Sequence, residues 1–175
     1  NKLYSNAQYG FAVYDAPPPG NQSLLEENDV YDNDVAGVFI TAGASATVTT
    51  NSIHGNACGV LVTDTGEGQL ENNDINNNKT GSGVMVKEEG NPTFVKNQVR
   101  DGLGAGITVC DGGRGSFLDN EICGNTGAGV DVFKSGNPQC MSNRVMDGKS
   151  DGVSVHDEGR GLFDGNCVSG NSLNG

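Results

Sequence analysis

Residues 111–120 read DGGRGSFLDN and residues 157–166 read DEGRGLFDGN, so nearly the same segment occurs twice, with starts 46 residues apart. Midway between them, residues 134–143 read KSGNPQCMSN, which keeps the glycine and the closing asparagine but replaces Gly-Arg-Gly by Gly-Asn-Pro. The repeat period is therefore about half of 46 residues. The turn alternates between two forms, which gives a super-repeat of two units.

An asparagine followed two positions later by an aliphatic residue recurs along the whole chain. After a first interval of 27 residues, the spacings are 23, 22, 24, 23, 23 and 23. The anchors of this pattern are Asn1, Asn28, Asn51, Asn73, Asn97, Asn120, Asn143 and Asn166. A fixed period of this length is typical of solenoid proteins.

Each unit contains three short strand-like stretches and no helical periodicity. The anchor stretch is followed by Gly-(Val/Ile)-x-(Val/Ile), and a third apolar stretch lies just before the next anchor. Because side chains alternate along a strand, Val60 and Val62 are expected to point inward and Leu61 outward. The pattern predicts an all-β fold, a right-handed parallel β-helix of the pectin-lyase-like type, with about seven coils of ~23 residues.

Two columns of asparagines are expected at the corners of the coils. The anchor amides, stacked at the ~4.8 Å strand spacing, predict a hydrogen-bonded ladder along the axis. Five residues after the anchors, a second column reads Asn6, Asn33, Asn56, Asn78, Gly102, Asn125, Gly148 and Asn171. Asn and Gly adopt positive φ most readily, so we predict that this second column forms a left-handed corner rather than a ladder.

The composition fits a single solenoid better than a globule. The 175 residues include 28 Gly and no Trp, and only 34% are hydrophobic. Such a chain can still bury a thin core between stacked coils. We expect residues 1–175 to form one β-helix. The sequence begins and ends within a repeat and shows no amphipathic cap, so we expect a fragment of a longer protein whose uncapped coils permit end-to-end self-association.

The net charge limits the classes of possible binding partner, and the positions of the cysteines indicate the redox state of the cellular compartment. A net charge of −12 argues against nucleic acid, anionic membrane surfaces and strongly acidic polysaccharides as partners. No hydrophobic run is long enough to span a membrane. The five cysteines fall in five different columns of the repeat, so neighbouring coils offer no disulfide framework. These features favour a reducing compartment, cytoplasmic or nuclear.

The paired repeats resemble those of a known family. The residues that carry the resemblance are ITVCDGGRGSFLDN at 107–120, GVDVFKSGNPQCMSNRV at 129–145 and VSVHDEGRGLFDGN at 153–166. They look like the carbohydrate-binding-and-sugar-hydrolase-type repeats in the β-helix of the F-box-only substrate adaptors, and more distantly like NosD-type periplasmic β-helices. In the adaptors the β-helix recognises substrates. The resemblance therefore implies a protein-binding surface, although no F-box is recognisable here.

Two outward columns contain apolar side chains where alternation predicts exposure. The first holds Phe39, Leu61 and Met85, and continues as Thr108, Asp131 and Ser154. The second holds Val95, Leu118 and Met141. Scattered exposed apolar residues are normal on soluble proteins, but consecutive ones at strand spacing also indicate a docking surface. We predict that these six residues bind a protein partner, which makes the chain a non-catalytic recognition scaffold.

A charged cluster on the anchor strands supports an alternative function. Asp74, Arg100, Glu121 and Arg144 are expected to meet across adjacent coils. In β-helical polysaccharide lyases, carboxylates neutralise a uronate while a basic side chain removes a proton. The alternative is therefore a carbohydrate-binding protein or a lyase or epimerase. A ladder of cross-strand ion pairs accounts for the same residues. The sequence predicts no catalytic residue, metal site or cofactor for the scaffold.

Overall fold

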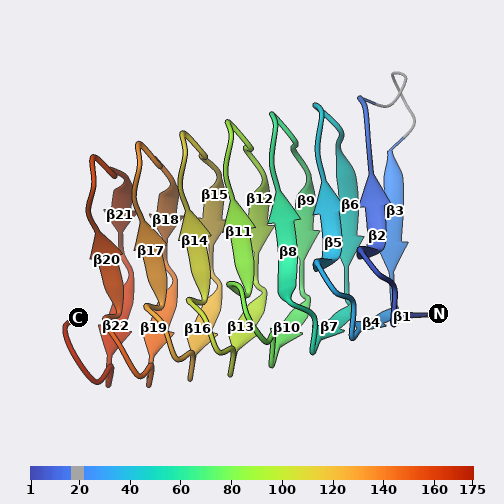
Figure 1. The fold of residues 1–175 in the computed structure, drawn as a ribbon. Helices are drawn as coiled ribbons and strands as arrows, with labels where there is room; N and C mark the ends of the chain where they lie inside the picture. Colours follow the sequence, from blue (N-terminus) through green and yellow to red (C-terminus); the bar gives the residue numbers. More distant parts are fainter. Residues whose placement is uncertain (17–21) are drawn as a thin grey trace.

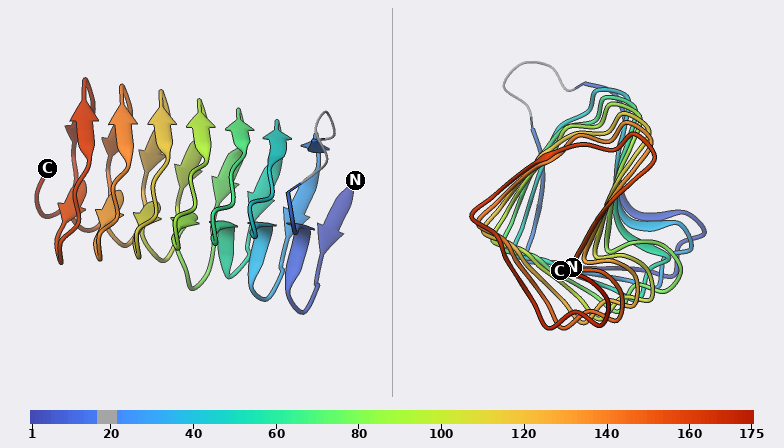
Figure 2. Two further views of the ribbon diagram at one scale, coloured as in Figure 1. Left: turned by 90° about the horizontal axis from the view of Figure 1, so that it is seen from above. Right: turned by 90° about the vertical axis from the view of Figure 1, so that its left-hand side faces the viewer.

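The computed structural model describes residues 1–16 and 22–175 and consists of three parallel β-sheets wound around one axis (Figure 1). Viewed along the axis, successive coils superpose as three-sided rings (Figure 2). Every strand pairs in parallel with the equivalent strand of the next coil, as in Ile75↔Val99. The prediction of an all-β parallel solenoid is confirmed, with coils of the expected length.

Within residues 1–16 and 22–175, the three sheets contain eight, seven and seven strands. Sheet A consists of the anchor strands β1 (Lys2–Tyr4), β4 (Asp29–Tyr31), β7 (Ser52–His54), β10 (Asp74–Asn76), β13 (Gln98–Arg100), β16 (Glu121–Cys123), β19 (Arg144–Met146) and β22 (Cys167–Ser169). Sheet B consists of β2 (Tyr9–Val13), β5 (Ala36–Ile40), β8 (Cys58–Val62), β11 (Val84–Val86), β14 (Ile107–Val109), β17 (Val130–Val132) and β20 (Val153–Val155). Sheet C consists of β3 (Ser23–Glu26), β6 (Ala46–Thr49), β9 (Gln69–Glu71), β12 (Thr93–Val95), β15 (Ser116–Leu118), β18 (Gln139–Met141) and β21 (Leu162–Asp164).

The core fills the space between the three sheets with one layer of side chains per coil. Val60 and Val62 are fully buried and Leu61 is partly exposed, as alternation predicts. In sheet C, Phe94 and Phe117 are fully buried and stack with ring centroids 5.3 Å apart. Because each coil contributes few apolar side chains, burial depends on the coils on both sides.

The anchor asparagines form the predicted ladder. Asn120 is representative: its Oδ1 accepts the backbone N–H of Asn97 at 2.9 Å and the Nδ2 of Asn97 at 3.1 Å. Its own Nδ2 donates to Phe94 O at 3.1 Å and to Asn143 Oδ1 at 3.0 Å. The amide therefore satisfies buried backbone groups at the corner between sheets C and A, where no strand ladder reaches them.

The second asparagine column is also a ladder, so the prediction of a left-handed corner at these residues was wrong. Asn33 Nδ2 donates to Asn56 Oδ1 at 2.8 Å, and Asn56 Nδ2 donates to Val30 O at 3.1 Å. The positive φ belongs to the residue just before the ladder position, such as Asp32 (53°) or Gly124 (65°). The preceding residue makes the turn, and the asparagine then points inward and bonds along the axis.

This second ladder is interrupted where glycine replaces asparagine. Gly102 donates its backbone N–H to Asn125 Oδ1 at 3.0 Å but presents no side chain to Asn78. Asn78 Nδ2 is buried and has no hydrogen-bond partner within the part of the chain that the structure describes. Gly102 and Gly148 lie two coils apart, in the two coils with a Gly-Arg-Gly turn, whereas Asn56, in the coil with a Gly-Glu-Gly turn, keeps the amide.

Candidate functional site: the outer face of sheet B

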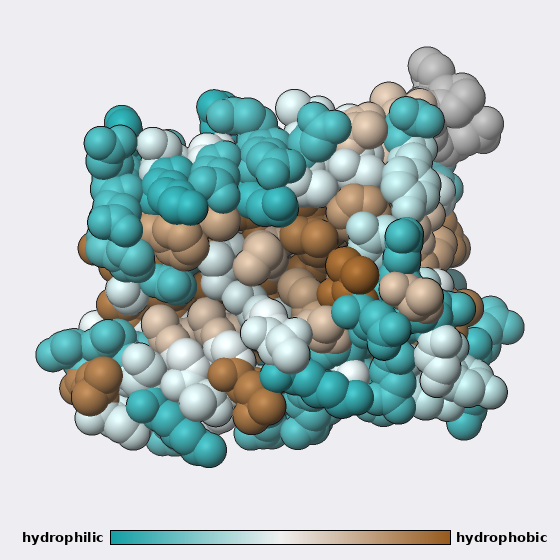
Figure 3. All heavy atoms as spheres, viewed as in Figure 1, coloured by the Kyte–Doolittle hydropathy of each residue, from teal (hydrophilic) through white to brown (hydrophobic). Residues whose placement is uncertain are grey.

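The outer face of sheet B brings the first predicted stripe together. Phe39 pairs with Leu61, Leu61 with Met85, and Met85 with Thr108 in register, so these residues form one column along the axis. Leu61 and Met85 are partly exposed at its centre. Figure 3 shows apolar side chains over sheet B as a brown band between two mainly hydrophilic ridges.

Phe39 does not have the exposure that its position in the strand predicted. Only 8% of the residue is accessible, because Tyr9 and Tyr14 of the preceding coil cover it. The ring of Tyr9 stacks on Phe39 with centroids 4.2 Å apart, and Tyr14 contacts it edge-on at 5.7 Å. The expectation that Phe39 itself is a free contact residue was therefore wrong.

Tyr9 and Tyr14 replace Phe39 as the outer surface at this end of sheet B. Tyr9 is partly exposed and Tyr14 is 54% exposed. The sequence contained a signal for Tyr14, because it lies two positions after the outward Ala12 and shares its face by alternation. The stacking of Tyr9 on Phe39 had no such signal, since it depends on contact between coils.

The turns on both sides of the stripe carry mainly acidic side chains. Lys79 pairs with Asp32 at 2.7 Å, and Lys87 pairs with Glu88 at 2.9 Å. Thr63 also donates a hydrogen bond to Glu88, and this bond together with Lys87 lowers the pKa of the carboxyl group. The exposed Asp34 and Asp64 form no ion pair with any described residue. The ridges beside Leu61 and Met85 therefore carry a net negative charge.

Two thiols lie beside the stripe, and their environment makes them unreactive. Burial raises the pKa of Cys58 to about 12, and its Sγ donates to Val60 O at 3.3 Å. Burial, with the nearby carboxylate of Asp111, raises the pKa of Cys110 to about 11. Because the thiolate is the nucleophile, these cysteines stay protonated and inert near neutral pH.

The second predicted stripe lies on the outer face of sheet C. Val95 pairs with Leu118, and Leu118 pairs with Met141, in register. All three side chains are partly exposed. They belong to a different sheet from Leu61 and Met85, so the six predicted protein-binding residues form two separate surfaces.

The charged cluster on sheet A consists of separate ion pairs. Arg100 Nη2 lies 2.7 Å from Asp74 Oδ2, and Arg144 Nη1 lies 3.3 Å from Glu121 Oε2. The pKa of Arg100 is raised, chiefly because Asp74 accepts its hydrogen bond. A guanidinium held in this way does not release a proton to act as a base. This arrangement matches a ladder of cross-strand ion pairs.

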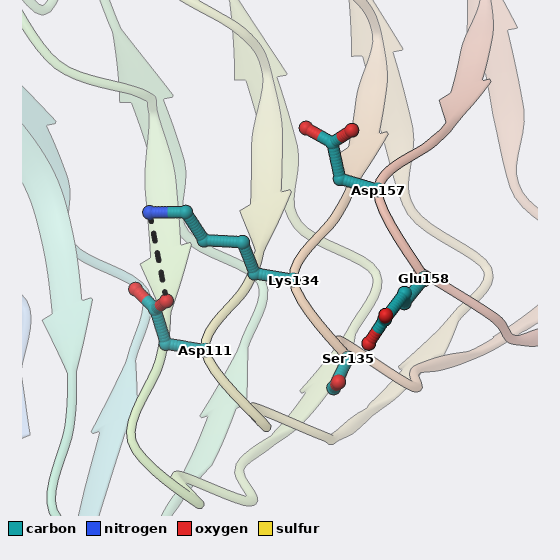
Figure 4. A pocket seen from close by; sticks show the side chains of 5 residues that line it. All are labelled: Asp111, Lys134, Ser135, Asp157 and Glu158. Atoms are coloured by element: carbon teal, nitrogen blue, oxygen red, sulfur yellow. Dashed lines mark ion pairs between the residues drawn. The ribbon is translucent and has the colours of Figure 1, made fainter.

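A column of turn residues between sheets B and C forms a shallow cavity of 570 Å³. Figure 4 shows Lys134 extended toward Asp111, with Asp157 and Glu158 on the next turn. The distance from Lys134 Nζ to Asp111 Oδ1 is 3.8 Å. Over residues 1–16 and 22–175, no group of three or more His, Cys, Asp or Glu side chains is arranged to hold a metal ion.

The sequence of the chain matches the model of a known protein family. A family model described as "Right handed beta helix region" matches residues 1–139 and 36–175, which together span the chain. The chain belongs to this right-handed β-helix family. The match establishes the predicted hand of the solenoid. It does not extend to the F-box adaptors or to NosD-type proteins. No curated protein and no solved structure matched this β-helix significantly.

A fold alone does not determine a function, so the function of this β-helix must be argued from the side chains on its outer faces. In the described part of the chain, no helix is long and apolar enough to cross a membrane. The outer face of sheet B between Tyr14 and Met85 combines partly exposed apolar side chains with acidic side chains in the flanking turns.

Proposed function

We propose that this β-helix is a non-catalytic recognition scaffold that binds a protein partner, in the manner of a substrate adaptor. The observation that carries the proposal is the partly exposed pair Leu61 and Met85, which continues the aromatic surface of Tyr9 and Tyr14 on one flat sheet face. A contiguous exposed apolar surface of this kind marks an interaction site. The paired arginines of sheet A do not favour the alternative of a lyase or epimerase.

The acidic ridges indicate the chemistry of the partner. A segment that carries bulky apolar side chains next to Lys or Arg would cover Leu61 and Met85 and place its cations near Asp34 and Asp64. Because Leu61 and Met85 are already mostly buried in the solenoid, covering their remaining exposed area contributes only about 1 to 3 kcal/mol of gross driving force before association costs. With Phe39 already covered, the stripe alone supports a modest interface. Val95, Leu118 and Met141 offer a second contact surface.

A displayed library of random peptides, selected on the immobilised chain, tests this function. We expect selection to enrich peptides with aromatic or leucine residues flanked by Lys or Arg. Leu61→Asp should abolish their binding, because it places a charge in the apolar band, whereas Ser154→Asp at the polar end of the same column should not. Circular dichroism establishes that both variants fold. Equal binding by Leu61→Asp and the unchanged chain would refute the proposed site.

A further inference from the structure

The outer face of sheet B continues past Met85 into a region that carries carboxylates. In the central column, Met85 pairs with Thr108, Thr108 with Asp131, and Asp131 with Ser154. Thr108 is only 4% exposed, and its hydroxyl lies 2.6 Å from the hydroxyl of Ser82. The face therefore passes from apolar to acidic within two coils, and the residue between the two ends is uncharged and already hydrogen-bonded within the protein.

Asp131 and Asp157 carry charge that no lysine or arginine of the described residues neutralises. Asp131 Oδ1 lies 3.2 Å from Nε2 of His156, and Asp157 Oδ2 lies 3.2 Å from Nδ1 of the same ring. Even a protonated His156 carries one positive charge against two carboxylates. Lys134 extends away from Asp157 toward Asp111, at 3.8 Å, as Figure 4 shows. This end of the face therefore stays negative and is complementary to a cation from a partner.

An aromatic ring lies beside these carboxylates. Phe133 is partly exposed, and alternation places it on the same side of the sheet as Asp131. Its ring stacks on His156 with centroids 5.2 Å apart, and Lys134 Nζ lies 5.8 Å from its centroid. A ring next to a carboxylate favours a cation on an apolar stem, because the stem packs on the ring while the charged group reaches the carboxylate. Lys and Arg side chains have this structure.

The distance between the two ends of the face sets the form of the partner. Leu61 and Asp131 are three coils apart in one column, which is ~14 Å at the strand spacing of ~4.8 Å. An extended chain covers this distance with about four residues, whereas a helix needs about ten. The strands β11, β14 and β17 are three residues long, or about 10 Å. A helix, about 10 to 12 Å wide with its side chains, would rest on the hydrophilic ridges of Figure 3 rather than on Met85.

We infer that the outer face of sheet B binds an extended polypeptide segment that runs along the solenoid, with apolar side chains over Leu61 and Met85 and a Lys or Arg at Asp131. This inference rests on the proposed protein-binding function and adds to it the conformation of the partner and the position of one required cation. That cation lies in line with the apolar stripe, two coils beyond Met85, and is separate from the contacts with the acidic ridges.

A displayed peptide library tests this inference on the chain of 175 residues. Each peptide carries a fixed Trp-Leu pair and a single Lys, separated in either chain direction by a spacer of Ser and Gly of variable length. Selection on the immobilised protein should enrich a separation of about four residues, as an extended chain requires.

Asp131→Asn should weaken the enriched peptides roughly fivefold in fluorescence-anisotropy titrations, because it removes the charge and keeps the shape of the side chain. The matched control is Asp29→Asn, which alters the same kind of contact on sheet A, where Asp29 Oδ1 lies 2.9 Å from His54 Nε2. Replacing the peptide's Lys by Gln should weaken binding equally and requires no change in the protein. With that peptide, Asp131→Asn should have no further effect.

Two results would overturn the inference and leave the proposed function in place. The first is a set of peptides that require Leu61 but bind Asp131→Asn as tightly as the unchanged chain. The second is an optimal separation near ten residues, which indicates a helical partner. If no peptide depends on Leu61 for binding, the proposed function fails and the inference fails with it.

Discussion

Completing the interrupted second ladder by Gly102→Asn should stabilise the protein. In the intact part of this ladder, Asn56 Oδ1 accepts the backbone N–H of Asn33 at 3.1 Å and its Nδ2 at 2.8 Å. An asparagine at 102 would offer the same acceptor to Asn78, whose Nδ2 is buried and has no partner among the described residues. The φ of Gly102 lies outside the left-handed region, so the backbone accepts a side chain.

The magnitude follows from the groups involved. Each new hydrogen bond adds about 0.5 to 1.5 kcal/mol to the free energy of unfolding. Replacing a glycine at a compatible site adds up to about 1 kcal/mol more, because it lowers the conformational entropy of the unfolded chain. Against this, a Cβ at 102 would lie 3.2 Å from Asn125 Oδ1, which must move by a few tenths of an ångström. We expect a net gain of about 2 kcal/mol, which corresponds to a rise in Tm of roughly 4 to 8 °C for a chain of this size.

Thermal and urea unfolding, followed by circular dichroism, measure this gain. The matched control is Gly102→Ala, which places a Cβ at the same position and restricts the unfolded chain equally but supplies no amide. Gly148→Asn provides a second comparison, since its Cβ would approach Asn171 Oδ1 to 2.9 Å and force a larger shift. If Gly102→Asn is no more stable than Gly102→Ala, the ladder contributes nothing at this corner and the reasoning fails.

Further predictions concern the other ladder residues and the thiols. Asn120→Ala should lower the free energy of unfolding by about 1 to 3 kcal/mol, because buried partners lose their bonds; a change below the error of urea titration would contradict its role. Asn125→Gly should also destabilise the protein measurably in the same titration, since Asn125 accepts a hydrogen bond from Gly102 N and donates one to Val99 O. An unchanged urea midpoint would instead support the interpretation that this column only forms a left-handed corner. Burial raises the pKa of Cys58 and of Cys140 from 9.0 to about 12. Above about pH 9 the unfolded chain therefore loses thiol protons that the folded chain retains. The free energy of unfolding should consequently fall as the pH rises from 9 toward 12. A free energy of unfolding that stays constant over this range would exclude buried protonated thiols. A thiol reagent at neutral pH should modify the exposed Cys167 in the folded protein and reach Cys140 only after unfolding, as mass spectrometry of the labelled chain would show.

Repetition and alternation in the sequence determined the solenoid. The anchor spacing fixed the coil length, and the order of apolar residues within each unit fixed which side chains point inward, as for Val60 and Val62. These properties are local: a residue's face in a strand depends on its immediate neighbours along the chain. For the same reason the columns containing Leu61 and Met85, and Leu118 and Met141, could be assigned before the structure was known.

Contacts between coils were decided only by the tertiary structure. The covering of Phe39 by Tyr9 and the ladder through Asn56 both join residues from different coils. Whether an asparagine makes a turn or a ladder depends on what the next coil places opposite it, and whether an outward side chain is exposed depends on the size of its neighbour along the axis. Stacking brings together residues about one repeat apart, and those contacts are set by the register of the coils rather than by the local sequence.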